Sequence, residues 1–118
     1  MDEQELKERF RQYSIRIVRM VDSIPTKRIA ALTIAKQVIR SGTSPAANYR
    51  AACVAKSKRD FLNKLKIVEE ELDETRYWLE LMVDTDIFPK EKLDSLIQET
   101  IELLNIIVKS IVSTRYYL

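Results

Sequence analysis

Apolar residues recur at every third or fourth position along most of this 118-residue chain, which is the spacing that places them on one face of an α-helix. Three short breaks separate four such stretches, and they fall at Pro25, at Ser57 and at Pro89. Reversal of the chain at these points gives helices of about 23, 31, 28 and 27 residues, or rods of roughly 35–47 Å. Rods of similar length with short connections pack as an up-and-down four-helix bundle. The pattern therefore predicts an all-α fold in which residues 1–118 form a single four-helix-bundle domain.

The same repeat identifies the side chains that we expect to face the core of the bundle. They are Leu6, Phe10, Tyr13, Ile17, Met20 or Val21, Ile24, Ile29, Leu32, Ala35, Ile39, Gly42, Ala46, Tyr49, Cys53, Phe61, Leu65, Val68, Leu72, Thr75, Leu79, Met82, Leu93, Leu96 or Ile97, Ile101, Leu104, Val108 and Ile111. Because Cys53 falls on this face, we expect it to be a small core residue and not a nucleophile.

The second helix contains a segment that is unfavourable for a continuous helix, Ser41-Gly42-Thr43-Ser44-Pro45. The apolar repeat keeps its phase across this segment, which predicts a kink or a short interruption near Gly42–Pro45 and not a reversal of the chain. Ser44 would cap the restarted helix, and Pro45 would occupy its first position, where a missing N–H costs nothing. The polar side chains expected to satisfy the backbone groups freed at Gly42 are Ser41, Thr43, Ser44 and Asn48.

Two further helix starts have polar residues of the kind that cap helices. Thr26, directly after Pro25, is expected to cap the second helix through its hydroxyl group. Ser57-Lys58-Arg59-Asp60 is similar to a capping box, with Asp in place of the usual Glu, and predicts the start of the third helix.

The composition excludes several kinds of chemistry. The chain has no histidine, one cysteine and one glycine. Without histidine it cannot form a nucleophile–His pair or a common zinc site, and with one glycine it has no glycine-rich phosphate loop. An all-carboxylate metal site at Glu69–Glu74 is much less expected than a solvated acidic face. We therefore predict a protein that is not an enzyme and has no metal, cofactor or small-molecule substrate.

The location of the chain in the cell is also predicted. A lone cysteine excludes an internal disulfide, no apolar run reaches the ~20 residues of a membrane span, and the first residues are acidic. These features favour a cytoplasmic protein that does not contact the membrane.

Charges are segregated along the chain. Residues 27–66 hold ten basic residues and one acidic residue, a net charge of +9, whereas residues 69–86 hold eight acidic residues and Arg76, a net charge of −7. A basic block of this density is typical of surfaces that bind phosphate groups of RNA or DNA. The residues predicted to form such a surface are Arg40, Arg50, Lys56, Lys58, Arg59, Lys64 and Lys66. Two other interpretations stay open: solvated helix faces, and pairing of the basic block with the acidic block of a neighbouring subunit.

Apolar residues of the third helix exceed what one core face needs. Ile67, Tyr77, Trp78 and Leu81 lie off the expected core stripe. A helix that is apolar on two faces usually buries both, so these four residues are predicted to form a contact between copies of the chain. The polar ends of Tyr77 and Trp78 would reach water or a neighbour. In the alternative, these residues flank a wide core face.

Several motifs carry a resemblance to a known family. Arg40-Ser41-Gly42-Thr43-Ser44 and Glu74-Thr75-x-Tyr77-Trp78-Leu79, with Asn48, Ala52, Ala55, Ser57 and Phe61 between them, resemble the bacterial 23S ribosomal RNA intervening-sequence protein family. The resemblance covers most of residues 10–115 and implies a four-helix bundle that assembles as a homopentamer, without implying an established activity. A fold relative, the accessory protein of diversity-generating retroelements, engages nucleic acid, which makes a nucleic-acid-binding ring an expectation by analogy.

The chain departs from the family pattern at Ala51, where family members usually have an acidic residue. If that acid pairs with an arginine elsewhere in the family, Arg40 or Arg50 is expected to be less neutralised here. Two functions follow as alternatives. One is a homo-oligomer, a pentamer by the resemblance, that binds RNA or DNA with little sequence preference. The other is a protein-interaction scaffold in which charge segregation serves subunit assembly.

Overall fold

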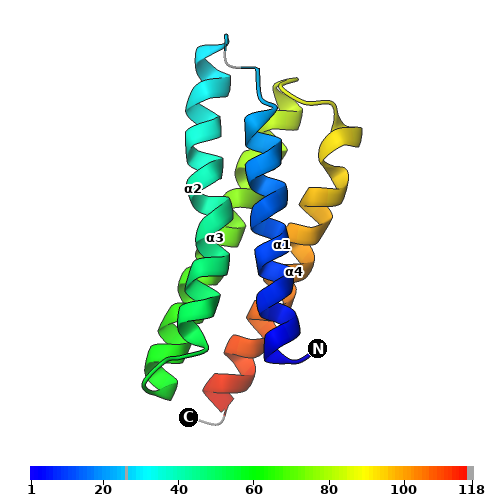
Figure 1. The fold of residues 1–118 in the computed structure, drawn as a ribbon. Helices are drawn as coiled ribbons and strands as arrows, with labels where there is room; N and C mark the ends of the chain where they lie inside the picture. Colours follow the sequence, from blue (N-terminus) through cyan, green and yellow to red (C-terminus); the bar gives the residue numbers. More distant parts are fainter. Residues whose placement is uncertain (26, 117–118) are drawn as a thin grey trace.

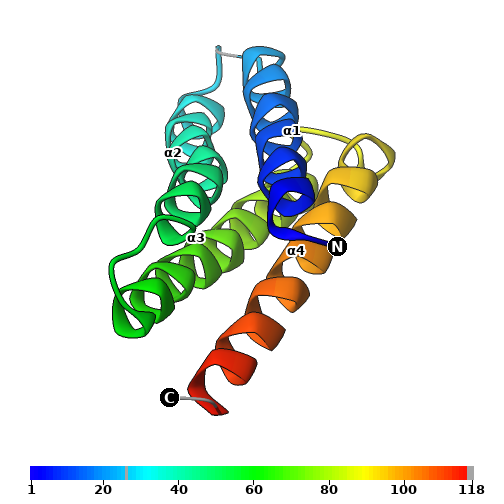
Figure 2. The same cartoon turned by 60° about the horizontal axis from the view of Figure 1, so that its bottom comes forward.

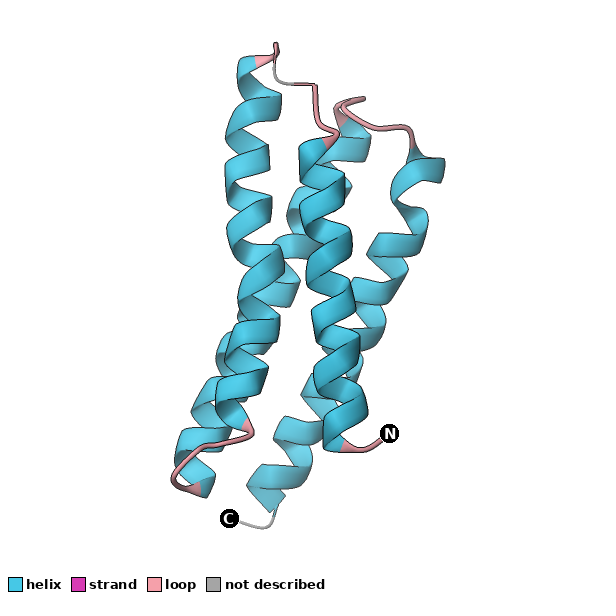
Figure 3. Ribbon diagram, viewed as in Figure 1, coloured by secondary structure: helices cyan, strands magenta, loops and turns pink. Residues whose placement is uncertain are grey.

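The computed structural model describes residues 1–25 and 27–116, and in these ranges it contains four α-helices and no strand (Figures 1 and 3). They are α1 (Glu3–Asp22), α2 (Ile29–Ala52), α3 (Lys58–Asp84) and α4 (Lys90–Tyr116). The chain reverses after each helix, so consecutive helices run in opposite directions (Figure 1). The predicted all-α, up-and-down four-helix bundle and its three reversals are confirmed.

Side chains define where two of the helices begin. Asp2 accepts the backbone N–H of Glu5 at 2.8 Å, and Glu5 accepts that of Asp2 at 3.4 Å, which completes a capping box on α1. On α3, the hydroxyl of Ser57 accepts the backbone N–H of Asp60 at 3.0 Å, as predicted. The Asp60 carboxylate accepts from Lys56 and not from Ser57, so only half of the predicted capping box forms. Thr26, the expected cap of α2, lies outside the described residues.

Helix α2 is continuous from Ile29 to Ala52, so the predicted interruption is wrong, and Ser44 is not a cap. Side chains in this segment form hydrogen bonds with backbone carbonyl groups one turn earlier in the helix. The Thr43 hydroxyl donates to the Ile39 carbonyl at 2.6 Å, and the Asn48 amide donates to the Ser44 carbonyl at 3.0 Å. Pro45 removes one backbone hydrogen bond, and its burial against the bundle offsets that loss.

Tertiary contacts explain the remaining residues of this segment. The Ser41 hydroxyl is buried and accepts a hydrogen bond from the Thr75 hydroxyl of α3 at 2.8 Å. Gly42 lies directly against Ile17 of α1. Ser41 and Gly42 therefore serve the packing of α2 on its neighbours and do not mark a break in the helix.

The core agrees with the predicted stripe on α1 and on most of α3, whereas on α2 and α4 only some of the predicted positions are buried. Ile29 and Leu32 are 86% and 41% exposed, because the buried face of α2 starts at Ala31 and Ile34. On α4, Val108 lies at the surface. The expected core residues that are only half-buried include Met20, Val21, Ile39, Ala46, Cys53, Phe61, Ile97, Ile101 and Leu104. In several places the residue next to a predicted core residue is the buried one. Residues buried in this way include Val38, Leu62, Thr100, Leu103 and Ile107.

Helices α1 and α4 meet over a short stretch only. The buried Tyr13 hydroxyl lies 2.6 Å from that of Thr100, and Arg9 binds both carboxylate oxygens of Glu99 at 2.8 and 2.6 Å. Beyond this contact, the C-terminal half of α4 diverges from α1 and projects past it (Figure 2). The bundle measures 48 × 22 × 20 Å.

Candidate nucleic-acid interface

Arg40 is neutralised within the chain. Its guanidinium group binds both carboxylate oxygens of Glu71 at 3.1 and 3.2 Å and also pairs with Glu74, both on α3. Of the two arginines expected to be less neutralised because the chain has Ala51 in place of an acid, Arg40 is paired within the chain, whereas Arg50 has no ion pair with a described residue. The reason for the pairing of Arg40 is that the antiparallel packing of α2 on α3 brings the acidic block alongside this arginine.

The same ion pair engages Trp78. The indole N–H of Trp78 donates to Glu74 at 3.0 Å, and the ring meets Tyr77 edge-on at 5.0 Å between centroids. The polar end of Trp78 is thus used inside the subunit, contrary to the expectation that it reaches water or a neighbour.

Lys64 also has a partner, whereas most of the other predicted cations do not. The Lys64 ammonium group donates to Asp60 at 3.1 Å, and this hydrogen bond lowers the pKa of the Asp60 carboxyl group. No ion pair joins the remaining predicted cations to any described residue. These are Arg50, Lys56, Lys58, Arg59 and Lys66, all exposed except for the half-buried Lys66.

The fold adds two cations that the sequence reasoning missed. Figure 1 shows the turn between α2 and α3 at the same end of the bundle as the C-terminal end of α4. Lys109 and Arg115 of α4 are exposed at this end and have no ion pair with a described residue. Only the up-and-down topology could have revealed them. We call the resulting surface the basic end, and it comprises Lys56, Lys58, Arg59, Lys109 and Arg115.

The four predicted contact residues on α3 are divided between surface and core. Ile67 and Tyr77 are 40% and 57% exposed, whereas Trp78 and Leu81 are half-buried and pack against the core. Exposed apolar side chains also occur where the sequence reasoning did not place them, with Val112 of α4 being 61% exposed.

Two further predictions concern the acidic block and the cysteine. In residues 1–25 and 27–116, no three of the Asp, Glu and Cys side chains are arranged to hold a metal ion. Cys53 is half-buried, and burial raises the pKa of its thiol group, which disfavours the reactive thiolate. None of the helices in the described part of the chain is long and apolar enough to cross a membrane.

Comparisons with known proteins identify the relatives of the chain. The family model described as 23S rRNA-intervening sequence protein matches residues 2–109. A solved structure from Bacteroides thetaiotaomicron VPI-5482, a protein of unknown function from the S23 ribosomal protein family, is 33% identical and superposes with a TM-score of 0.82. That match covers 90% of this chain and 97% of the other. No curated protein matches the chain. Neither matching description names an enzymatic activity.

A family match over nearly the whole chain and a solved relative of the same fold agree with the motifs around Gly42 and Trp78. The chain belongs to the 23S rRNA-intervening sequence protein family.

Proposed function

We propose that this protein is a non-enzymatic homo-oligomer, a pentamer by its family resemblance, that binds the phosphate backbone of RNA or DNA with little sequence preference. The observation that carries the proposal is the distribution of free cations. Arg9, Arg40 and Lys64 are paired within the chain, whereas the five cations of the basic end have no ion pair with a described residue.

The five unpaired, exposed cations of the basic end favour a polyanion as the ligand. Each phosphate neutralised by Lys or Arg releases condensed counterions, so affinity gained in this way falls steeply with salt. Arg40 is already paired with carboxylates and would have to break those contacts first, which leaves it out of the proposed surface.

The aromatic residues support weak sequence preference. Tyr49, the one aromatic residue within the basic block before Phe61, is buried and stacks on Phe10 at 5.1 Å between ring centroids. It therefore cannot act as a platform for bases. Contacts of the five cations with phosphate groups, which are the same in every sequence, would give little sequence preference.

Exposed apolar side chains support self-association. Ile67 and Tyr77 on α3 and Val112 on α4 are large and exposed. A contiguous exposed apolar patch is typical of contacts between subunits, and we propose that these residues contribute to such a patch.

Fluorescence anisotropy with a labelled single-stranded RNA of roughly 20 nucleotides tests the proposal. Binding is expected at about 50 mM salt and should weaken strongly at about 200 mM. The triple variant Lys56→Glu, Lys58→Glu, Arg59→Glu should lose binding. The matched control is Lys27→Glu, Lys90→Glu, Lys92→Glu, which makes the same charge change at exposed positions of the opposite end.

Equal losses in the two variants would mean that net charge alone governs binding, and the basic end would not be the interface. No binding by the unaltered protein at the lower salt concentration would overturn the nucleic-acid proposal and favour a protein-interaction scaffold. Sedimentation tests the assembly, because a species of 13.8 kDa at micromolar concentration would remove the oligomer.

A further inference from the structure

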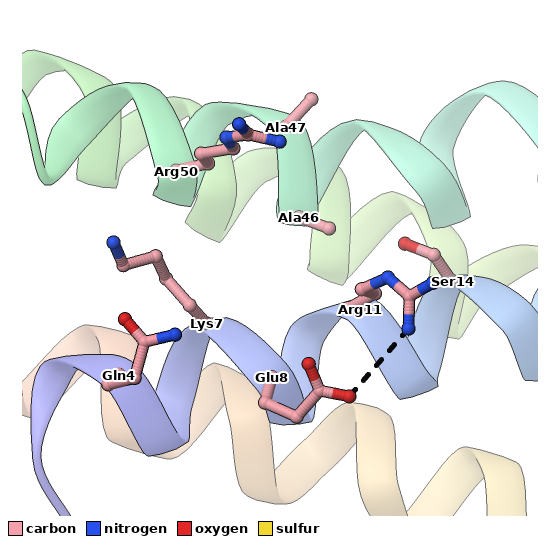
Figure 4. Close-up of a pocket in the computed structure, with 8 residues that line it drawn as sticks. All are labelled: Gln4, Lys7, Glu8, Arg11, Ser14, Ala46, Ala47 and Arg50. Carbon is pink, nitrogen blue, oxygen red and sulfur yellow. Dashed lines mark ion pairs between the residues drawn. The ribbon is translucent and has the colours of Figure 1, made fainter.

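A cleft of about 440 Å³ lies between α1 and α2, near the N-terminal half of α1 (Figure 4). Two small residues on α2, Ala46 and Ala47, leave this space open, because a methyl group does not reach across to the facing helix. Its volume is within the range typical of small-ligand sites, roughly 300–1,000 Å³. The lining residues are Gln4, Lys7, Glu8, Arg11 and Ser14 of α1 and Ala46, Ala47 and Arg50 of α2.

The charge of the cleft is positive, with three cations and one carboxylate in its lining. Arg50 has no ion pair with a described residue, and the ammonium group of Lys7 is 3.9 Å from Glu3, at the outer limit of an ion pair. The single carboxylate is already engaged, since Glu8 accepts a hydrogen bond from Gln12 at 2.9 Å and lies 3.7 Å from Arg11. The two helices thus each present a cation that has capacity for an anion.

The positions of the side chains suit an anion between the helices. In Figure 4, Lys7 extends from α1 towards α2, and Arg50 lies on the opposite side of the space. Gln4 and Ser14, whose side chains can donate hydrogen bonds, are also among the lining residues. The Ser14 hydroxyl is buried and has no hydrogen-bond partner in the chain, which is unusual for a buried polar group.

We infer that the cleft between α1 and α2 binds a phosphate group, with Lys7 and Arg50 holding it from the two sides and Arg11 adding positive charge. Arginine forms bidentate hydrogen bonds with phosphate oxygens, and lysine contributes a point charge. The phosphate has two sources with the same chemistry, the backbone of a nucleic acid and a free phosphorylated small molecule.

The inference deepens the proposed function and rests on it for the first of these sources. Arg50 lies in the last turn of α2, just before the turn that carries Lys56. The cleft therefore adjoins the basic end, and one strand could contact both surfaces.

Inorganic pyrophosphate is the probe for the site itself, with binding measured by titration calorimetry on the assembled protein. The unaltered protein should bind pyrophosphate, and the triple variant Lys7→Gln, Arg11→Gln, Arg50→Gln should lose at least about tenfold in affinity. The matched control Lys56→Gln, Lys58→Gln, Arg59→Gln removes the same charge from the basic end and should stay within about twofold of the unaltered affinity.

A second variant separates the shape of the site from its charge. Ala47 is exposed at the rim of the cleft, so Ala47→Trp should fold normally, and its large indole ring would cover part of the cleft without any change in charge. It should lose pyrophosphate binding as the triple variant does. Should the triple variant fail to fold by circular dichroism, Ala47→Trp and the single Arg50→Gln carry the test.

The outcomes distinguish the site from the proposed function. The inference is overturned if the unaltered protein does not bind pyrophosphate, or if both cleft variants bind it as well as the unaltered protein does. This holds whatever the result of the RNA-binding measurement. RNA binding weakened by both the cleft variants and the basic-end control supports the cleft as a contact for the strand. A third outcome is that the cleft variants lose pyrophosphate binding while neither the unaltered protein nor any variant binds RNA. This outcome supports a site for a small phosphorylated molecule and overturns the proposed function.

Discussion

Gly42 of α2 and Ile17 of α1 are packed so closely that a Cβ atom at position 42 would lie 2.7 Å from Cγ2 of Ile17. Cδ1 and Cγ1 of the same isoleucine would both lie 2.9 Å away, and the side chain is fully buried. Relief of the contact would thus require movement of the whole isoleucine within the core. The only glycine of the chain thus lies where α2 packs tightly against Ile17 of α1.

The variant Gly42→Ala is therefore expected to be less stable than the unaltered protein. Alanine gains up to about 1 kcal/mol over glycine from helix propensity, but overpacking a filled core costs roughly 1–3 kcal/mol. We expect a net loss in the free energy of unfolding, measured by urea denaturation.

The double variant Gly42→Ala, Ile17→Ala is the control, because truncation of Ile17 removes the atoms that the new methyl group would meet. The two substitutions should be coupled, so that the double variant loses less than the sum of the single losses. An increase in stability of Gly42→Ala alone would show that α1 and α2 separate at little cost.

Alkaline pH should destabilise the fold through its buried tyrosines. Tyr13 is 1% exposed and Tyr49 is 7% exposed, and burial raises the pKa of both phenols well above the ordinary value. In the unfolded chain they ionise near pH 10, so above that pH the unfolded state binds fewer protons than the native state. The stability that the neutral phenols contribute is complete below pH ~10 and is lost as pH rises towards the native pKa values.

Urea denaturation at a series of pH values measures this loss. Each tyrosine should contribute a slope of about 1.4 kcal/mol per pH unit above pH ~10. Tyr13→Phe should remove one of the two contributions, at a cost of about 1 kcal/mol at neutral pH from its lost hydrogen bond to Thr100. An unchanged slope in this variant would indicate that other groups govern the alkaline transition.

Assembly should depend on the exposed isoleucine of α3. Ile67 is 40% exposed, so Ile67→Asp should be tolerated by the single subunit and should weaken any contact that buries this face. Sedimentation is expected to shift from a multiple of 13.8 kDa towards the single chain.

The control for charge is Gln98→Asp, which also adds one carboxylate at an exposed helical position, on α4. It should sediment as the unaltered protein does. If both variants keep the same assembly, Ile67 lies outside the interface, and Val112 becomes the next position to test.

The sequence predicts the reversals of this bundle well and the faces of its helices less well. Pro25, Ser57 and Pro89 interrupt the helical repeat strongly enough to place each turn. Helix α2, however, has apolar or small residues on several faces, so its buried side depends on which neighbour packs closest. Small residues such as Ala31 fit that contact, and Ile29 is left exposed although it is the larger apolar residue.

The candidate site required tertiary information for a similar reason. The pairing of Arg40 with Glu71 depends on the register of α2 against α3, and local sequence spacing does not encode that register. Lys109 belongs to the basic end only because the C-terminal end of α4 and the start of α3 lie at the same end of the bundle. The space at Ala47 becomes a cleft only because α1 places long polar side chains opposite it.

Two arginines of α2 provide a matched test of the proposed interface, since they share a helix, a charge and an exposed position. Arg40 is paired with Glu71 and Glu74, whereas Arg50 has no ion pair with a described residue. Arg40→Gln should therefore leave RNA affinity within about twofold, and Arg50→Gln should lower it and reduce the slope of log affinity against log salt by ~0.7.

The free energy of unfolding should change in the opposite order, with the larger loss in Arg40→Gln. Arg40→Gln breaks a two-carboxylate ion pair that is half-exposed, at a cost of up to about 1 kcal/mol, and Arg50→Gln breaks no ion pair. Anisotropy across a salt series and urea denaturation of the same two proteins measure both effects. Equal losses of RNA affinity in the two variants would contradict the assignment, because it would show that pairing with the acidic block does not withdraw Arg40 from the nucleic acid.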